Sequence, residues 1–455
     1  MTVEELISEF RERTKGSRSQ RECYATYLAD SRASAGYKSL LRDIHYPIVG
    51  SRAAGSHIWD VDGNSYIDLS MGFGVQLFGH AAPFVTDAIA DQLALGIQLG
   101  PQARLAGEVA ELIAKATGVE RLCFCNTGTE AVMTALRLAR TQTNRQKIAM
   151  FTWSYHGHFD GTLARPAMRD GERQSIPAFP GVPASLAADT VMLNYCDDAA
   201  FDVLEKESAD LAAVIVEPIQ SVQPWLRPGE FLRKLREWTT DRDVPLIFDD
   251  VLLGFRVHLG GSQAMFGVKP DIVTFGKILG GGLPIGVVAG GARYLEAIDG
   301  GAWTPANELT PSGRRTFFAG TYNKNPISMA AARAVLRRLL DEGPELQALL
   351  NETSETFTSE LNRWLQDREI PIRIEGFGSL FRFRGRQLDL FFYKLLLNGV
   401  YLWEGRSCFL STAHTKADLA ELTSAIQDAA LWWSEVGGRS DASPTSCRAK
   451  ALDKP

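Results

Sequence analysis

Six short runs of apolar residues recur between residues 121 and 290, and they constrain the fold more than any other feature of the sequence. Each run has the length of a β-strand and contains three or more consecutive or nearly consecutive apolar residues, which is typical of strands buried on both faces of a sheet. The first two runs are separated by TEAVMTALRLART, where Val132, Leu136 and Ala139 form one helical stripe. Apolar strands alternating with helices predict an α/β domain with a mainly parallel sheet covered on both faces. The six runs are RLCFCN, KIAMFT, AAVIVEP, PLIFDD, DIVTFG and IGVVAG.

The rest of the chain divides around this predicted sheet. Residues 55–70 contain two alternating apolar runs joined by Asp62-Gly63-Asn64, which predicts a β-hairpin. After about residue 325, a long helical region precedes short strands and further helices, which indicates a smaller α+β domain. We therefore expect an N-terminal segment and hairpin (1–70) that packs with the small domain, a large domain (71–325), the small domain (326–436) and a disordered polar tail (437–455).

Composition argues against several classes of function. The net charge of −6 and the pI near 5.8 give no basic field for nucleic acid. No stretch approaches the ~18 apolar residues of a membrane span, and the start MTVEELISEF lacks the basic and apolar regions of a signal peptide. The six cysteines have no metal-site spacing. We expect a reduced, cytoplasmic protein without a nucleic-acid or membrane partner.

The stretch PDIVTFGKILGGGLPIGVVAG, residues 270–290, brings a single lysine, Lys277, to the end of an apolar run. Burial disfavours the ammonium and lowers its pKa, so the amine can form a Schiff base with a carbonyl compound. The glycines around it, among them Gly276 and Gly286, are expected to leave room for an aromatic cofactor. A solvated lysine before a glycine-rich turn would explain the same pattern, so other segments must decide.

Two further strand ends carry polar groups. CFCNTGTEAV, residues 123–132, is typical of a strand, a polar turn and a helix start, which together can bind a phosphate through free backbone N–H groups. An ordinary helix cap by Thr127 or Thr129 explains it equally well. PLIFDDVLLGFR ends a strand with Asp249 and Asp250, one of which could keep a pyridinium nitrogen protonated. The alternative is a carboxylate pair stabilised by Arg256.

A fourth strand end, FTWSYHGHFDG at residues 151–161, places Tyr155 where it could stack on a flat cofactor. His156 and His158 would point to opposite sides of an extended segment, and no third ligand is nearby. We therefore expect no metal site.

Taken together, the motifs resemble class III aminotransferases, which are pyridoxal-phosphate (PLP) enzymes of the aspartate-aminotransferase fold, or fold type I. The resemblance covers residues 20 to 435 and rests on NTGTEAVMTALRLAR, YHGHFDG, VIVEP, FDDVLLGFR, FGKILGGGLPIG and FAGTYNKNPISMAAA. It implies that Lys277 binds PLP covalently, that Asp249 pairs with the pyridine nitrogen, and that Val251 and Tyr155 pack on the two ring faces. Lys277, Asp249 and Tyr155 are the catalytic residues that it implies. The remaining cofactor contacts that it implies are Thr127, Gly128, Thr129, His156, Glu217, Gly320 and Thr321, with Thr321 supplied by the second subunit of a homodimer.

Three positions depart from the family pattern. Asp250 stands where the family usually has glutamate, and Leu252 stands where many members have a glutamine that contacts the ring oxygen. Cys408-Phe409 stands where members that use ω-amino acids often carry an arginine for the α-carboxylate. The pattern is closer to glutamate-1-semialdehyde aminomutase. MGFGVQLFGH and WEGRSCFLSTAHT are more similar still to the aminotransferase domains of polyketide and nonribosomal peptide assembly lines.

This resemblance predicts transfer of an amino group from an amino-acid donor to a β-ketoacyl thioester on an acyl carrier protein, in natural-product biosynthesis. Two alternatives are an enzyme acting on a free small molecule, such as glutamate-1-semialdehyde 2,1-aminomutase or an ω-aminotransferase, and a non-catalytic scaffold of the same fold. The intact Lys277, Asp249 and Tyr155 argue against the scaffold. Glu217 is expected near the substrate, with apolar residues at an entrance for the carrier arm and Arg406 on the donor carboxylate. The expected substrate contacts are Phe73, Glu217, Trp403, Arg406 and Phe409.

Overall fold

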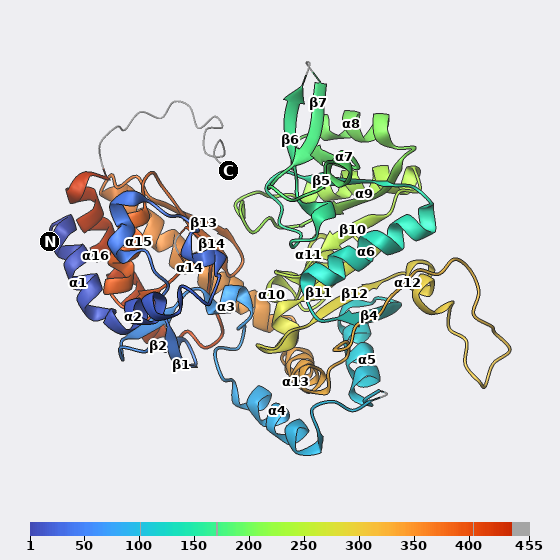
Figure 1. The fold of residues 1–455 in the computed structure, drawn as a ribbon, viewed down its shortest axis with the longest axis horizontal. Helices are drawn as coiled ribbons and strands as arrows, with labels where there is room; N and C mark the ends of the chain where they lie inside the picture. Colours follow the sequence, from blue (N-terminus) through green and yellow to red (C-terminus); the bar gives the residue numbers. More distant parts are fainter. Residues whose placement is uncertain (101, 170–171, 404, 439–455) are drawn as a thin grey trace. The chain divides into compact units, whose positions relative to one another are not determined.

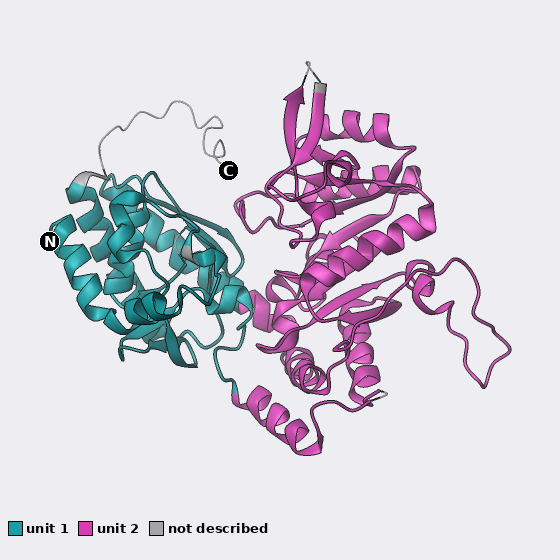
Figure 2. Cartoon of the chain, viewed as in Figure 1, with its two compact units in different colours: residues 1–82, 350–452 teal, residues 83–349, 453–455 magenta. Residues whose placement is uncertain are grey.

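The computed structural model describes residues 1–100, 102–169, 172–403 and 405–438. The chain forms two compact units (Figure 2). Unit 1 contains residues 1–82 and the part of the chain that begins at residue 350, and unit 2 contains residues 83–349. Of the tail that the sequence predicts to be disordered, residues 439–455 lie outside the described residues. No helix within the described ranges is long and apolar enough to cross a membrane.

Unit 2 is built on a seven-stranded sheet with the strand order β4-β12-β11-β10-β9-β5-β8 (Figure 1). Strand β12 runs antiparallel to β11 and β4, and the other neighbours are parallel. The six apolar runs are six of these strands, so the predicted mainly parallel sheet is confirmed. The missed strand, β8, lies at the edge of the sheet. The bounds are β4 Arg121–Cys125, β5 Lys147–Phe151, β8 Thr190–Leu193, β9 Leu211–Val216, β10 Leu246–Asp249, β11 Ile272–Gly276 and β12 Gly286–Gly290.

Helices accompany the sheet along the chain of unit 2. Helix α6, Gly128–Thr143, buries Val132, Leu136 and Ala139, which confirms the predicted stripe. A small hairpin of β6 and β7 was not predicted. The bounds of the other elements are α4 Pro83–Leu95, α5 Leu105–Thr117, η3 Asp160–Thr162, β6 Ala164–Arg169, β7 Glu172–Pro177, α7 Ala184–Ala188, α8 Ala199–Glu207, α9 Gly229–Asp241, α10 Gly254–Val257, α11 Gly261–Phe266, η4 Lys277–Gly280, α12 Ala292–Asp299 and α13 Pro326–Glu342.

Unit 1 contains two small sheets, with the orders β1-β2-β3-β15 and β13-β14-β16. Strands β2 and β3 form the predicted hairpin, and the Asp60 carboxylate accepts the N–H groups of Asp62 and Asn64 in its turn. The bounds are α1 Val3–Arg13, α2 Lys15–Tyr24, η1 Ser31–Ala33, η2 Ser39–Ile44, β1 Gly50–Ala54, β2 His57–Asp60, β3 Ser65–Asp68, α3 Met71–Gly74, α14 Glu345–Asp367, β13 Arg373–Phe377, β14 Leu380–Arg384, α15 Asp389–Leu397, β15 Val400–Tyr401, β16 Cys408–Phe409, α16 Lys416–Trp433 and η5 Ser434–Gly438.

The unit boundaries differ from the expected divisions after residues 70 and 325. They fall after residue 82 and after residue 349, inside α14. The reason for the second difference is α13, which packs against α4, α5 and η4 and therefore lies with the large sheet. The N-terminal hairpin and the C-terminal strands share unit 1, where β15 pairs with β3.

Candidate active site

Four adjacent parallel strands of unit 2 carry polar residues at or just after their carboxyl ends, which lie at the same end of the sheet. Lys277 follows β11, Asp249 ends β10, Glu217 follows β9 and Tyr155 follows β5. Ligands in open α/β sheets bind at the carboxyl ends of the strands. Two contacts join these strand ends: the Tyr155 N–H donates to Glu217 (3.2 Å), and His156, the next residue, pairs with Asp249.

The Asp249 carboxylate is buried and has a partner on each oxygen. Its Oδ2 lies 2.7 Å from Nδ1 of His156, which is also buried. Its Oδ1 accepts the Thr274 hydroxyl (3.2 Å) and the Val251 N–H (3.3 Å). These bonds fix the orientation of the carboxylate, and Thr274 is a contact that the sequence analysis missed. The other ring nitrogen of His156 is buried and has no partner among the described residues.

Lys277 combines a partly buried amine with a strained backbone. Its φ is +44°, in the left-handed region that residues with a Cβ rarely adopt. Burial lowers the pKa of Lys277, and the negative charges of Asp249 and Glu217 oppose that shift. The lowered pKa increases the fraction of neutral, nucleophilic amine. Strained backbone of this kind is often found at functional sites.

Three glycines of this region, Gly128, Gly276 and Gly286, lie so close to other protein atoms that a Cβ would be crowded there. A Cβ on Gly128 would lie 2.8 Å from Val251 Cγ1, and one on Gly276 would lie 3.2 Å from the same atom. A Cβ on Gly286 would lie 2.2 Å from the carbonyl oxygen of Thr127. The expectation that the glycines leave space for a cofactor stays a prediction, and Gly276 and Gly286 have a further role in packing. They allow Val251 and the turn before α6 to approach the sheet.

The start of α6 provides donors beside this cluster. Thr127 caps the helix by accepting the Glu130 N–H (3.1 Å). The N–H groups of Gly128 and Thr129, in the first turn, have no intrahelical acceptor and are available to an anion. The loop after β5 packs directly against this turn, since a Cβ on Gly157 would lie 2.4 Å from Thr129 Oγ1.

Asp250 faces away from these contacts. Its carboxylate accepts the N–H (2.7 Å) and the hydroxyl (2.5 Å) of Ser262, which lies in α11. Burial raises the pKa of Asp250 to about 7. The two adjacent aspartates thus have separate roles, one in the cluster and one in anchoring the following helix.

The segment that contains Gly320 and Thr321 contacts the same end of the sheet within this chain. The Asn126 side chain, which follows β4, donates to Asn323 Oδ1 (3.1 Å). The Thr321 carbonyl accepts from Gln98 (3.3 Å), and Thr321 is exposed.

Four of the five expected substrate contacts lie in unit 1. The rings of Phe73 and Trp403 have centroids 5.0 Å apart, and Arg406 has its guanidinium carbon 5.8 Å from the Trp403 centroid. Arg32, which the sequence analysis did not single out, approaches the same ring to 5.7 Å. Phe409 is different: it is 2% exposed and its N–H donates to the Leu69 carbonyl, so it belongs to the interior and does not line an entrance.

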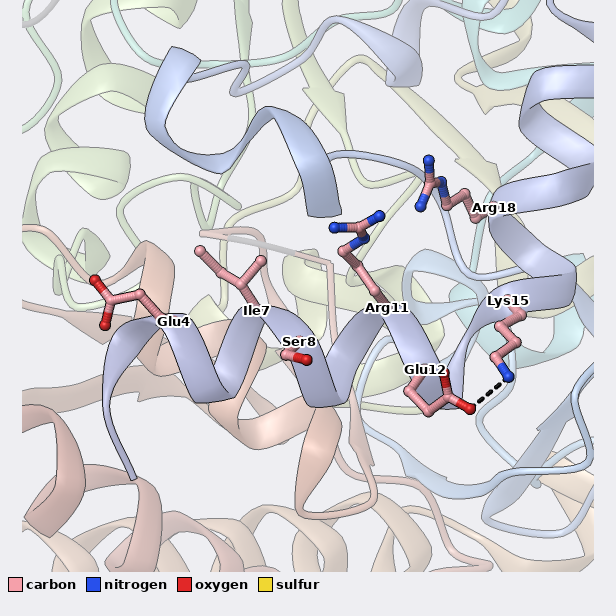
Figure 3. Close-up of a pocket in the computed structure, with 7 residues that line it drawn as sticks. All are labelled: Glu4, Ile7, Ser8, Arg11, Glu12, Lys15 and Arg18. Atoms are coloured by element: carbon pink, nitrogen blue, oxygen red, sulfur yellow. Dashed lines mark ion pairs between the residues drawn. The ribbon is translucent and has the colours of Figure 1, made fainter.

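A surface groove of about 390 Å³ lies along α1 and α2 of unit 1. Figure 3 shows Arg11 and Arg18 directed to the same side of these helices, while Lys15 pairs with Glu12. Arg18 also pairs with Glu22, so much of the positive charge is already neutralised. The strand-end cluster of unit 2 therefore remains the candidate active site.

Comparison of the sequence with known proteins assigns the chain to a family. The family model "Aminotransferase class-III" matches residues 41–429. The chain belongs to the class III aminotransferases. Glutamate-1-semialdehyde 2,1-aminomutase of Archaeoglobus fulgidus is 36% identical over 403 residues, which cover 84% of this chain and 92% of that protein. The protein of the same name from Chloroflexus aurantiacus is 37% identical over 410 residues, covering 84% and 89%.

Solved structures agree with this assignment. An omega-transaminase from Sphaerobacter thermophilus superposes with a TM-score of 0.80 at 28% identity, covering 91% of this chain and 97% of that one. A β-phenylalanine aminotransferase from Variovorax paradoxus gives 0.81 at 28% identity, covering 95% and 97%. The predicted fold type I architecture is confirmed, and this class III aminotransferase is a PLP-dependent enzyme.

The residues at the sheet edge fit PLP. A buried carboxylate, Asp249, suits a protonated pyridine nitrogen. The open N–H groups of Gly128 and Thr129 suit a phosphate, and the amine of Lys277 suits an aldehyde. The pyridine nitrogen, the phosphate and the aldehyde of the cofactor thus each have a matching group in unit 2.

Proposed function

We propose that this enzyme transfers an amino group from an amino-acid donor to a keto acceptor and that Lys277 is its covalent attachment point for PLP. The observation that carries the proposal is the placement of Lys277 at the end of β11, next to the strand that ends in the buried, hydrogen-bonded Asp249. PLP supplies an aldehyde and a ring that stabilises a carbanion when a proton leaves the substrate.

The surrounding residues would hold the cofactor. Asp249 would pair with the pyridine nitrogen, and His156 and Thr274 keep its carboxylate in place. Val251 and Tyr155 would pack on the two ring faces. The remaining proposed contacts are Thr127, Gly128 and Thr129 for the phosphate, Glu217 near the substrate, and Gly320 and Thr321 from the second subunit of a homodimer.

Lys277 would also move the proton of the reaction. Its Nζ, with a pKa lowered by burial, is suited to take a proton from the substrate Cα and to return it to a neighbouring atom. The opposing charges of Asp249 and Glu217 allow the amine to hold that proton between the two transfers. A single amine therefore acts as both base and acid.

For the acceptor we propose a β-ketoacyl thioester presented by an acyl carrier protein. A thioester has no carboxylate, and the buried Phe409 stands where members that use ω-amino acids often carry an arginine for the α-carboxylate. Phe73, 44% exposed, and Trp403 provide apolar surface for an acyl chain. Arg406, which is exposed, is the proposed grip for the carboxylate of the donor.

The second candidate is isomerisation of glutamate 1-semialdehyde. It is supported by the relatives of that name, which match at 36–37% identity over about nine-tenths of their length. In that reaction the amine would return to the carbon skeleton that supplied it, without a carrier protein.

A substrate comparison separates these proposals. Purified enzyme with PLP is assayed with glutamate 1-semialdehyde and, in the presence of glutamate or glutamine, with a β-ketoacyl chain on a carrier protein and the same chain as a free acid. We expect a kcat/KM at least tenfold higher for the carrier-bound chain. Efficient isomerisation of the semialdehyde with no turnover of the carrier-bound chain would establish the second candidate instead.

The Lys277→Ala variant tests the shared chemistry. It should lower turnover of any accepted substrate by about 1,000-fold or more, because both covalent attachment and proton transfer are lost. Activity within tenfold of wild type at saturating PLP would refute the role of Lys277. An unchanged circular dichroism spectrum serves as the folding control.

A further inference from the structure

Two buried side chains that follow β9, those of Gln220 and Glu217, form hydrogen bonds with the loop after β5. The Nε2 group of Gln220, which is 1% exposed, donates to the Thr152 carbonyl (2.8 Å) and to the Ser154 hydroxyl (2.9 Å). One residue further, Glu217 accepts the Tyr155 N–H at 3.2 Å. The path of this loop is therefore set by hydrogen bonds from the neighbouring strand.

The residue between the two Gln220 contacts is strained. Trp153 has a φ of +69°, a left-handed conformation that costs a residue with a large side chain about 1–3 kcal/mol. Trp153 is 50% exposed, so burial of this residue does not account for the strain. Gln220 binds the chain immediately before and immediately after it, at Thr152 and Ser154.

The stability of the fold does not by itself explain a glutamine at this position. The Oε1 atom of Gln220 is buried and has no partner among the described residues. An unpaired buried amide oxygen costs free energy, and a leucine of similar size would avoid that cost. What the glutamine adds is a donor that reaches both sides of Trp153.

We propose that Gln220 is a positioning residue: it keeps Trp153 in the left-handed conformation and thereby sets the positions of Tyr155 and His156. Tyr155 is 60% exposed, so the direction of its side chain depends on how its backbone is held. His156 must reach Asp249 from the same short loop, at 2.7 Å. If Trp153 left the left-handed conformation, the backbone of the loop would shift and would displace Tyr155 and His156 from the proposed cofactor site.

The test compares Gln220→Leu with a matched control, Gln347→Leu. Gln347 is also buried, and its Nε2 group also donates to a backbone carbonyl, that of Phe255 (3.1 Å). Its Oε1 atom likewise has no partner among the described residues. Within the part of the chain that the structure describes, its amide group donates to Phe255 and not to the loop after β5. A loss of stability alone would thus appear in both variants.

The first readout is hydrogen exchange of residues 152–158 in protein without cofactor, and the second is PLP affinity by fluorescence titration. We expect Gln220→Leu to speed exchange of the Tyr155 amide and to weaken PLP binding, each about tenfold or more, with Gln347→Leu unchanged in both. Gln220→Glu, which keeps the volume but as a carboxylate has no N–H to donate, should resemble Gln220→Leu and serves if the leucine variant does not fold. If the Tyr155 amide exchange rate and the PLP affinity of these Gln220 variants equalled those of the wild type, the proposal would be overturned.

A second-site change tests the route through Trp153. Glycine adopts a φ of +69° without strain, so in a Trp153→Gly background the Gln220→Leu effect on PLP affinity should shrink to about threefold or less. An undiminished effect would show that Gln220 does not act through Trp153. Both readouts precede turnover, so they do not depend on which acceptor the enzyme uses.

Discussion

Asp249 and Asp250 are adjacent in sequence, yet their carboxylates serve different parts of the structure. Asp249 contacts His156 and Thr274 in the active-site cluster, whereas Asp250 binds both donors of Ser262. The replacement of the usual family glutamate by Asp250 therefore concerns the anchoring of α11. We expect changes at the two positions to affect different measurements.

Asp249→Asn should slow the chemical step while leaving the fold intact. The asparagine oxygen can still accept from His156, but it carries no charge to hold the pyridine nitrogen protonated. We expect the rate of the first half-reaction, measured by stopped-flow absorbance with donor alone, to fall by about 100-fold or more. A rate within threefold of wild type would contradict the proposed role.

Asp250→Asn should change how stability depends on pH. Burial raises the pKa of Asp250 from the usual 3.8 to about 7, so between about pH 4 and 7 the folded protein binds more protons than the unfolded chain. The contribution of Asp250 to stability therefore falls across this range as pH rises, and the variant lacks this contribution. The measurement is the melting temperature of the wild type and of Asp250→Asn from pH 4 to pH 8, with Asp341→Asn, a change at an exposed aspartate, as the control. If Asp250→Asn differed from the wild type by the same melting temperature at pH 4 and at pH 8, the prediction would be contradicted.

At the level of elements, strands were predictable where burial on both faces makes nearly every residue apolar, as in β9. The edge strand β8 has only four residues and was missed, as was the β6–β7 hairpin. Polar contacts such as those of Thr274 and Gln220 could not be predicted, because their partners are distant in sequence and leave no local pattern. The burial of Phe409 likewise depends on tertiary packing.

The cap of α6 offers a prediction at this level. Thr127→Ala removes the acceptor for the Glu130 N–H, which should cost about 1 kcal/mol or roughly 2–4 °C in melting temperature. Thr415→Ala removes the equivalent cap of α16 in unit 1 and should cost about as much. Only Thr127→Ala should also weaken PLP binding. Equal PLP affinities in the two variants would argue against phosphate binding at this turn.

For the whole molecule, unit 2 exposes apolar side chains that the proposed homodimer would have to cover. Figure 1 shows the segment between α12 and α13 extending away from the sheet. This segment exposes Trp303, Leu309 and Phe317, and the end of α4 exposes Leu95. Large exposed apolar groups of this kind are common at protein interfaces. The proposed homodimer would cover them and would bring Thr321 of one subunit to the site of the other.

Complementation between two inactive variants tests this arrangement. Thr321→Glu should be inactive because its charge repels the phosphate, and Lys277→Ala lacks the essential amine. When the two are mixed and allowed to exchange subunits, half of the dimers become mixed dimers. In each of these, one site combines an intact Lys277 with an intact Thr321 from the partner, so activity should recover to about a quarter of the wild-type value. If Thr321 served the site of its own chain, the mixture would stay inactive, since every site would contain one of the two defects. Native mass spectrometry of the mixture, with one variant carrying a mass tag and showing mixed dimers, is the control that makes a lack of recovery decisive.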